Sequence, residues 1–125
     1  MPHSLDPSAF ILDDVVDFLA GDSRVLSFTL TDGNGNPVDV SNATIEYRWF
    51  EREYQTGDSA AVLTGDDADV EIVTDNRVDT TAGEFEIRLD PSATVDLYGD
   101  YYQKARVVQE DESEASWVGR INITA

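Results

Sequence analysis

The chain has 125 residues, no cysteine and one histidine, and its 26 acidic against 8 basic side chains give a formal net charge of −18. This length predicts one domain with a core of its own, and the missing thiols exclude a disulfide framework and any zinc or iron–sulfur site built on cysteine. A field of this sign repels phosphate backbones and anionic membranes, so we expect no nucleic-acid partner and no membrane partner.

No apolar run approaches the ~20 residues that span a bilayer, and no signal-peptide pattern is present. We therefore expect a soluble protein that is not exported by that route. Lys104 is the single lysine among the 8 basic residues. An acidic chain almost without lysine is typical of adaptation to molar salt, where charges are screened within about 3 Å. We predict a halophilic, archaeal source; an acidic mesophilic protein is the alternative.

The N-terminal segment carries two competing signals. Asp6–Pro7 and the spacing of the apolar residues that follow favour a short helix. Alternation toward the turn at Gly21–Asp22 equally fits a strand. We predict a helical or irregular arm over residues 1–13 and then a strand, with the domain itself over residues 14–125.

Next in the chain, Leu26–Leu30 alternates apolar and polar residues, which predicts a half-buried strand. The turn DGNGNP begins at Asp32 and has the D-x-N-x-N spacing of the first ligands of a calcium-binding EF-hand loop. That loop needs Gly at its sixth position and Glu at its twelfth, where this sequence has Pro37 and Ala43. We therefore predict a turn and not a calcium site.

Further alternating segments predict a series of strands separated by turn signals. They lie near residues 45–50, 70–72, 85–89, 101–107 and 117–123. Asp90–Pro91 predicts one short helical turn near residues 91–97. We expect Trp117 to anchor the core. Short strands joined by turns predict an all-β, antiparallel sandwich or barrel.

Two stretches carry a resemblance: GDSRVLSFTLTDGNGNPVDVSNATIEYRW at 21–49 and AGEFEIRLDPSATVDLYGDYYQKARVV at 82–108. They resemble the immunoglobulin-like domain at the N-terminus of phage baseplate upper proteins and of related small virion proteins. That family has a Gly-Asp turn, a D-x-x-G-x-P-V-D segment and a later G-x-F-x-I/V-x-L strand. The first stretch matches at Gly21, Asp22, Asp32, Gly35, Pro37, Val38, Asp39, Ser41, Ala43 and Ile45. Val40 replaces the usual Leu, and no fibre or coiled coil follows.

The resemblance implies an antiparallel immunoglobulin-like β-sandwich, with Tyr101 at the position of the corner tyrosine. It also implies a virion structural protein of a tailed virus that infects a halophilic archaeon. Its place would be the tail, the baseplate or the capsid surface, as a turret or fibre base. Its partners would be other virion proteins, in multiple copies of a symmetric assembly. The alternative is a cell-surface or carbohydrate-binding adhesion module of a halophile; position in the particle and copy number stay open.

Catalytic interpretations find little support. The histidine is His3, near the terminus, and no nucleophile elbow or Gly-rich phosphate loop is present. The acidic residues at 66–71 are predicted to form a solvated loop and strand edge, with a cation site as the less favoured alternative. We expect no enzymatic activity, no cofactor and no metal.

Two candidate interfaces remain. In WFEREY, side chains opposite to the core-facing ones would combine arginine with aromatics, a composition enriched at interface cores. We call this set the outward stripe: Arg48, Phe50, Arg52 and Tyr54. Alternatively, its arginines balance nearby acids and its aromatics cover a loop or an edge. The second candidate comprises Phe10, Ile11 and Leu12, which have no strand partner evident in the sequence and would contact another chain.

Overall fold

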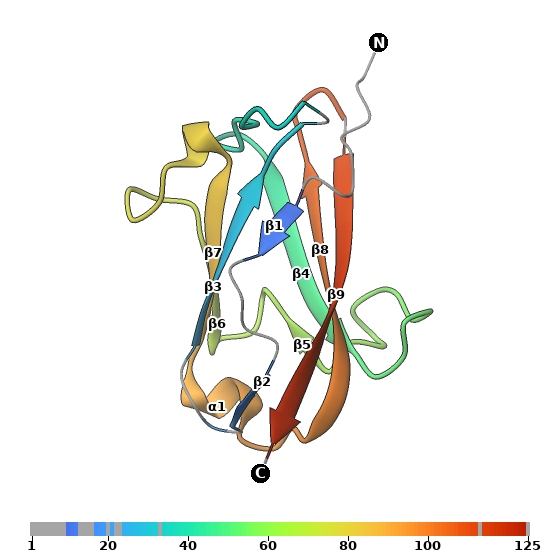
Figure 1. Cartoon of the computed structure of the whole chain (residues 1–125). Helices are drawn as coiled ribbons and strands as arrows, with labels where there is room; N and C mark the ends of the chain where they lie inside the picture. Colours follow the sequence, from blue (N-terminus) through green and yellow to red (C-terminus); the bar gives the residue numbers. More distant parts are fainter. Residues whose placement is uncertain are drawn as a thin grey trace.

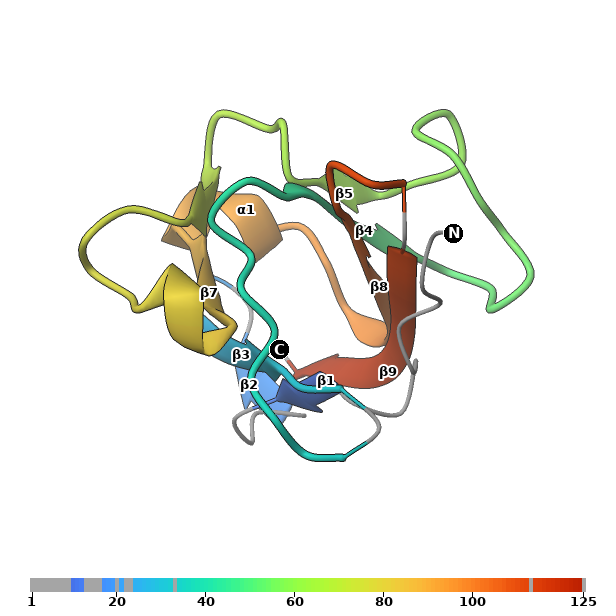
Figure 2. The same ribbon diagram turned by 90° about the horizontal axis from the view of Figure 1, so that it is seen from above.

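The computed structural model describes residues 10–12, 17–19, 21, 24–32, 34–112 and 114–124. For residues 10–12 and 17–19 it describes the backbone and its strand pairing but not the side chains. Two β-sheets face each other across one apolar core (Figures 1 and 2). The first sheet contains, in order, β1 (Phe10–Leu12), β3 (Arg24–Leu30), β7 (Glu84–Leu89) and β6 (Val70–Val73). The second contains β2 (Asp17–Leu19), β9 (Glu114–Thr124), β8 (Gly99–Val108), β4 (Thr44–Phe50) and β5 (Leu63–Thr64).

This strand order is that of an immunoglobulin-like sandwich. The first sheet has the A-B-E-D order and the second the G-F-C order extended by a short C′ strand. Pairing is antiparallel throughout the described strands, except that β2 runs parallel to the end of β9. The predicted fold class is therefore confirmed.

One short helix, α1 (Pro91–Thr94), and one 3-10 turn, η2 (Thr80–Ala82), interrupt the strands. Pro91 occupies the first turn of α1, where its missing N–H has no hydrogen bond to lose, and Asp90 before it is extended. The predicted helical turn is confirmed. None of the helices in the described part of the chain has the length and apolar character needed to cross a membrane.

Alternate residues of the facing strands fill the core. The rings of Phe28 and Phe85 stack at 4.9 Å between centroids, and both side chains are buried. Trp117 meets Phe28 edge-on at 5.4 Å and is partly buried against the core, as expected of an anchor. Burying one large apolar side chain stabilises the fold by about 1.5–3 kcal/mol, so these alternating segments favour the sandwich.

The backbone of Phe10–Leu12 differs from the expectation of an arm without a strand partner. It pairs antiparallel with β3, with Ile11 opposite Thr29. The other edge of β3 is occupied by β7, so β1 provides partners for backbone groups that an edge strand leaves open. A sequence pattern shows that a segment can form a strand but does not show its neighbour. The boundary at residue 13 and a contact of the arm with another chain stay predictions.

Candidate functional site

The outward surface of β4, β8 and β9 collects much of the positive charge of this acidic chain. The pairing register places Arg48 beside Lys104 and Lys104 beside Val118, with Glu46, Arg106 and Ser116 in the next row. A third row joins Phe50, Tyr102 and Arg120. We call these nine side chains the outer face. It contains Arg48, Lys104, Arg106 and Arg120, half of the 8 basic residues.

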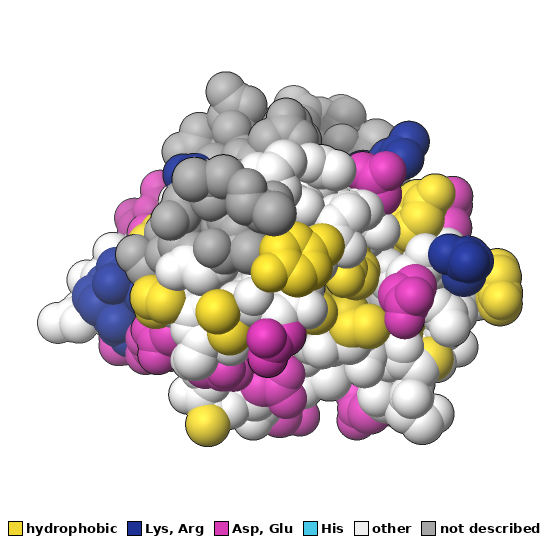
Figure 3. Space-filling view, turned by 90° about the horizontal axis from the view of Figure 1, so that it is seen from below, with side chains coloured by type: hydrophobic (Ala, Val, Ile, Leu, Met, Phe, Trp, Pro, Cys, Tyr) yellow, Lys and Arg dark blue, Asp and Glu magenta, His cyan; other side chains and the backbone are white. Residues whose placement is uncertain are grey.

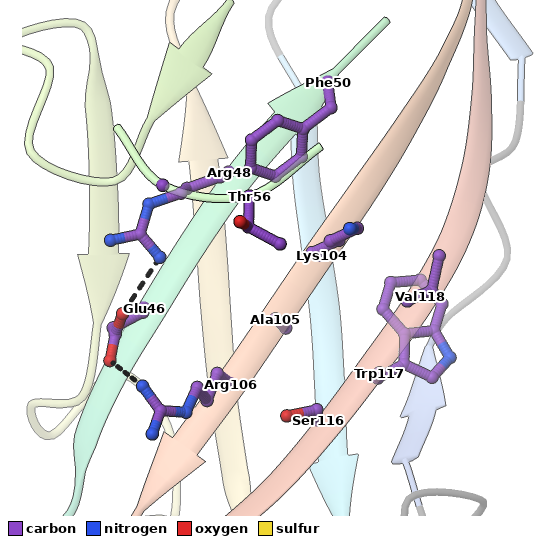
Figure 4. Close-up of a pocket in the computed structure, with 11 residues that line it drawn as sticks. Glu46, Arg48, Phe50, Thr56, Lys104, Ala105, Arg106, Ser116, Trp117 and Val118 are labelled. Carbon is purple, nitrogen blue, oxygen red and sulfur yellow. Dashed lines mark hydrogen bonds and ion pairs between the residues drawn. The ribbon is translucent and has the colours of Figure 1, made fainter. Parts of the chain in front are cut away.

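A groove of about 490 Å³ lies on this face. Figure 4 shows its lining, which comes from β4, β8 and β9 together with Thr56 of the 51–62 loop. Glu46 lies between Arg48 and Arg106 and forms ion pairs with both (Figure 4). The groove is therefore polar along the β4–β8 side, while Val118, 47% exposed, adds apolar surface from β9.

An ion-pair network ties the elements of the outer face together. Arg48 Nε donates to Asp58 Oδ1 at 2.6 Å, and Arg48 Nη1 donates to Glu46 Oε1 at 2.9 Å. Arg106 connects Glu46 to Glu114, so the network reaches from the 51–62 loop across β4 and β8 to β9. The carboxylates of Asp58 and Glu46 raise the pKa of the Arg48 guanidinium.

Replacing Arg48 by methionine is expected to lower the free energy of unfolding by less than about 1 kcal/mol, because partly exposed ion pairs are screened by solvent. The substitution keeps the apolar stem and removes the contacts to Asp58 and Glu46. Hydrogen exchange should become faster in residues 51–62, while urea unfolding changes little. An unchanged exchange rate would show that Asp58 does not hold this loop.

Lys104 of β8 also contacts the 51–62 loop. Its Nζ donates to the carbonyl oxygens of Glu53 and Gln55, each at 2.6 Å, and lies 5.0 Å from the centroid of the Phe50 ring. Phe50 is 1% exposed as a result of this cover. The ammonium charge is thus balanced by carbonyl dipoles and an aromatic face, a cation–π contact.

The structure divides the outward stripe. Arg48 points away from the core but is half-buried and paired, and Phe50 is buried. β4 ends at Phe50, so strand alternation does not extend to Arg52 and Tyr54, which lie in the following turn. The exposure expected of Phe50 is therefore wrong, because the 51–62 loop folds back over it. A partner contact by Arg52 or by Tyr54, 81% exposed, stays a prediction.

The sequence reasoning missed the contribution of β8 and β9. Their outward residues Lys104, Arg106, Val118 and Arg120 alternate with buried or half-buried ones, so the outward direction could have been read from the pattern. Their assembly into one face with Arg48 could not, because it depends on the register between strands more than 50 residues apart.

The Asp32 segment forms the predicted turn. Asp32 Oδ1 accepts hydrogen bonds from the backbone N–H groups of Asn36 at 3.0 Å and Asn34 at 2.9 Å, and these bonds lower the pKa of the Asp32 carboxyl. In the acidic loop, Asp67 accepts bonds from Thr64 and Glu71 pairs with Arg77. Among the described residues, no group of three or more His, Cys, Asp or Glu side chains could hold a metal ion.

Tyr101 lies at the start of β8, where a corner tyrosine is expected. Its hydroxyl accepts a hydrogen bond from the backbone N–H of Tyr98 at 3.3 Å, three residues upstream. At this end of the sandwich, beside α1, Val95 and Tyr98 are exposed. Figure 3 shows apolar side chains interspersed with carboxylates there, in contrast to the cationic outer face.

Neither a family model nor a curated protein matches the sequence. Among solved structures, the filamin domain of Lin-41 is similar, with 14% sequence identity, a TM-score of 0.52 and 97% of each chain covered. AggA, the major subunit of aggregative adherence fimbriae type I from Escherichia coli, matches with 13% identity over 99% of this chain and 98% of that one, at a TM-score of 0.38. The filamin similarity shows the fold alone. The chain is an immunoglobulin-like β-sandwich.

Proposed function

We propose that this chain is a non-catalytic assembly module that binds other proteins through one face of its sandwich. The outer face carries the proposal, because half of the 8 basic residues gather there on a chain of net charge −18. Arginine beside aromatic and apolar residues is a composition enriched at interface cores.

More specifically, we propose a structural protein of the virion of a tailed virus that infects a halophilic archaeon. The support is the resemblance of residues 21–49 and 82–108 to the immunoglobulin-like domain of baseplate upper proteins. In the structure these stretches supply β3 and β7 of the first sheet, β4 and β8 of the second, and α1. The partners would be other virion proteins, in multiple copies at the tail, the baseplate or the capsid surface.

The particle assignment is tested on purified virions. Mass spectrometry of gradient-purified particles should detect this chain at a fixed ratio to the major capsid protein, and antibody labelling should place it at one structural position. Particles that lack the chain would exclude the virion role, and detection on the cell envelope alone would favour the adhesion alternative.

The halophilic proposal predicts a salt-dependent fold. The midpoint of thermal unfolding should fall steeply as salt is removed, since the screening length grows from about 3 Å at 1 M to about 30 Å at 0.01 M and the net charge of −18 then repels itself. Circular dichroism across a potassium chloride series measures this midpoint. Sucrose at equal osmolality serves as the control for water activity, and an unchanged midpoint in dilute buffer would exclude halophilic adaptation.

A further inference from the structure

Two cations of the outer face are not matched by acids. In the described part of the chain, salt bridges join Arg48, Arg77, Arg88 and Arg106 to carboxylates. Lys104 instead contacts two carbonyl oxygens, and the guanidinium of Arg120 lies 5.6 Å from the centroid of the Tyr102 ring. The chain has 26 acidic residues, yet none of the described ones forms a salt bridge with Lys104 or Arg120. The guanidinium of Arg120 is therefore available to a carboxylate of a partner, and the Lys104 ammonium, held by carbonyl oxygens, adds positive potential beside it.

Apolar surface adjoins these charges in a regular pattern. Val118, 47% exposed, lies opposite Lys104, and Tyr102, half-buried, lies opposite Arg120. Successive outward residues of a strand are about 7 Å apart. Along β9 this spacing places an apolar side chain one step from a guanidinium. An extended segment with an acidic residue at one position and an apolar residue two positions later presents both to one face at this spacing, and it has the complementary charge.

The groove lies beside the outward strip of β9 formed by Val118 and Arg120. Its volume of about 490 Å³ lies between the 51–62 loop and β9, within the range of pockets that enclose small ligands or a few side chains. The loop wall is anchored by Lys104 and Asp58. The site is therefore held in place by contacts that are already made before a partner binds.

We propose that the groove and the adjacent strip of β9, marked by Lys104, Val118 and Arg120, bind an extended acidic segment of a partner protein. This inference rests on the proposed assembly function and names its site and the chemistry of the partner. Carboxylates of the segment lie against Arg120 and the Lys104 edge of the groove, and its apolar side chains cover Val118. A second copy of the chain is a poorer occupant, because in a two-fold dimer the same face meets itself and places cations against cations.

The test uses two fluorescein-labelled peptides, Glu-Ser-Leu-Ser-Glu-Ser-Leu, which presents Glu and Leu on one face of an extended chain, and its counterpart with Gln in place of Glu. Fluorescence anisotropy is measured with the full chain at the lowest salt at which circular dichroism shows the folded β-structure. We expect the Glu peptide to bind about tenfold more tightly than the Gln peptide, since charge pairing is the term that differs. Equal binding of the two peptides, or binding of neither, would overturn the proposal.

Variants locate the site. The double substitution Arg120→Glu with Val118→Ser changes two exposed side chains and should weaken Glu-peptide binding by about tenfold or more. Arg77→Glu makes the same change of charge beside β6, on the other sheet, and should leave binding near its original value. Equal loss in both variants would show a general charge effect and overturn the assigned site.

Sedimentation of the chain without peptide tests whether a second copy of the chain occupies the groove. Self-association that the Arg120→Glu, Val118→Ser variant abolishes would assign the site to a second copy and overturn the acidic partner. If purified particles contain the variant at the normal ratio, the virion role stands and the groove is not its attachment site, so the two proposals fail separately.

Discussion

Replacing Gly83 by alanine is expected to lower the free energy of unfolding by about 3 kcal/mol, the upper range for a strained backbone position combined with steric overlap. Gly83 has φ +81°, and a Cβ there would lie 2.3 Å from the carbonyl oxygen of Leu30 and 3.0 Å from that of Val38. Both neighbours are backbone atoms. Leu30 in addition donates its N–H to the Gly83 carbonyl at 2.9 Å, so neither segment can move without losing pairing.

Gly35 provides the matched control. Its φ is +82°, but no atom lies within 4 Å of the position of an added Cβ. Alanine at residue 35 should cost only the about 1–2 kcal/mol of a left-handed backbone. Urea unfolding followed by tryptophan fluorescence, at one fixed salt concentration, measures both variants. Equal losses would show that the overlap with Leu30 and Val38 relaxes at little cost.

Gly83 also shows what a motif match can and cannot predict. It is the glycine of the G-x-F-x-I/V-x-L pattern, and the pattern alone gives no physical reason for a glycine at this position. The structure supplies the reason: the chain turns here from η2 into β7 while touching the end of β3. A single sequence does not contain that contact, since Leu30 and Val38 are distant in the chain.

Local patterns predicted the elements whose cause is local. Alternation predicted β3, β4, β7, β8 and β9, and Asp90–Pro91 predicted α1. The two-residue strand β5 has no period of its own and forms because Leu63 and Thr64 lie opposite Trp49 and Arg48. Likewise, β1 is defined by its pairing with β3. The sequence analysis therefore missed β5 and expected no strand partner for β1, because both strands are defined by a neighbouring strand and not by their own pattern.

The candidate site divides in the same way. Alternation gave the correct direction for Arg48, away from the core, but exposure also depends on what covers a side chain. Phe50 is 1% exposed because the 51–62 loop, fixed by Lys104 and Asp58, folds over it. Loop placement of this kind is set by long-range hydrogen bonds and leaves no period in the sequence.

Three buried side chains of the core, Tyr47, Trp49 and Gln103, are joined by a chain of hydrogen bonds. Trp49 Nε1 donates to the Tyr47 hydroxyl at 2.7 Å, and that hydroxyl donates to Gln103 Oε1 at 2.6 Å. Each of the three side chains is at most 1% exposed. Burial raises the pKa of Tyr47, so its hydroxyl stays protonated and available as a donor at every pH at which the protein would be handled.

Tyr47→Phe is therefore expected to lower the free energy of unfolding by about 3 kcal/mol, because it removes the hydroxyl that accepts from the Trp49 indole N–H and donates to the Gln103 amide oxygen. Losing a buried hydrogen bond costs about 1–3 kcal/mol. Tyr102→Phe on the outer face is the control and should be nearly neutral, since Tyr102 is half-buried and its ring contact with Arg120 does not use the hydroxyl. Urea unfolding at fixed salt measures both.

The double variant Tyr47→Phe with Gln103→Met separates hydrogen bonding from packing. Gln103 Nε2 is buried without a hydrogen-bond partner in the described structure, so methionine removes one donor that is already unsatisfied and one acceptor that Tyr47→Phe would leave unsatisfied. Replacing both partners of a buried bond by apolar groups of similar shape is close to neutral. The double variant should thus be more stable than Tyr47→Phe alone, a coupling visible in a double-mutant cycle. Strict additivity of the two single losses would show that the Tyr47 hydroxyl acts through its packing and not through the bond to Gln103.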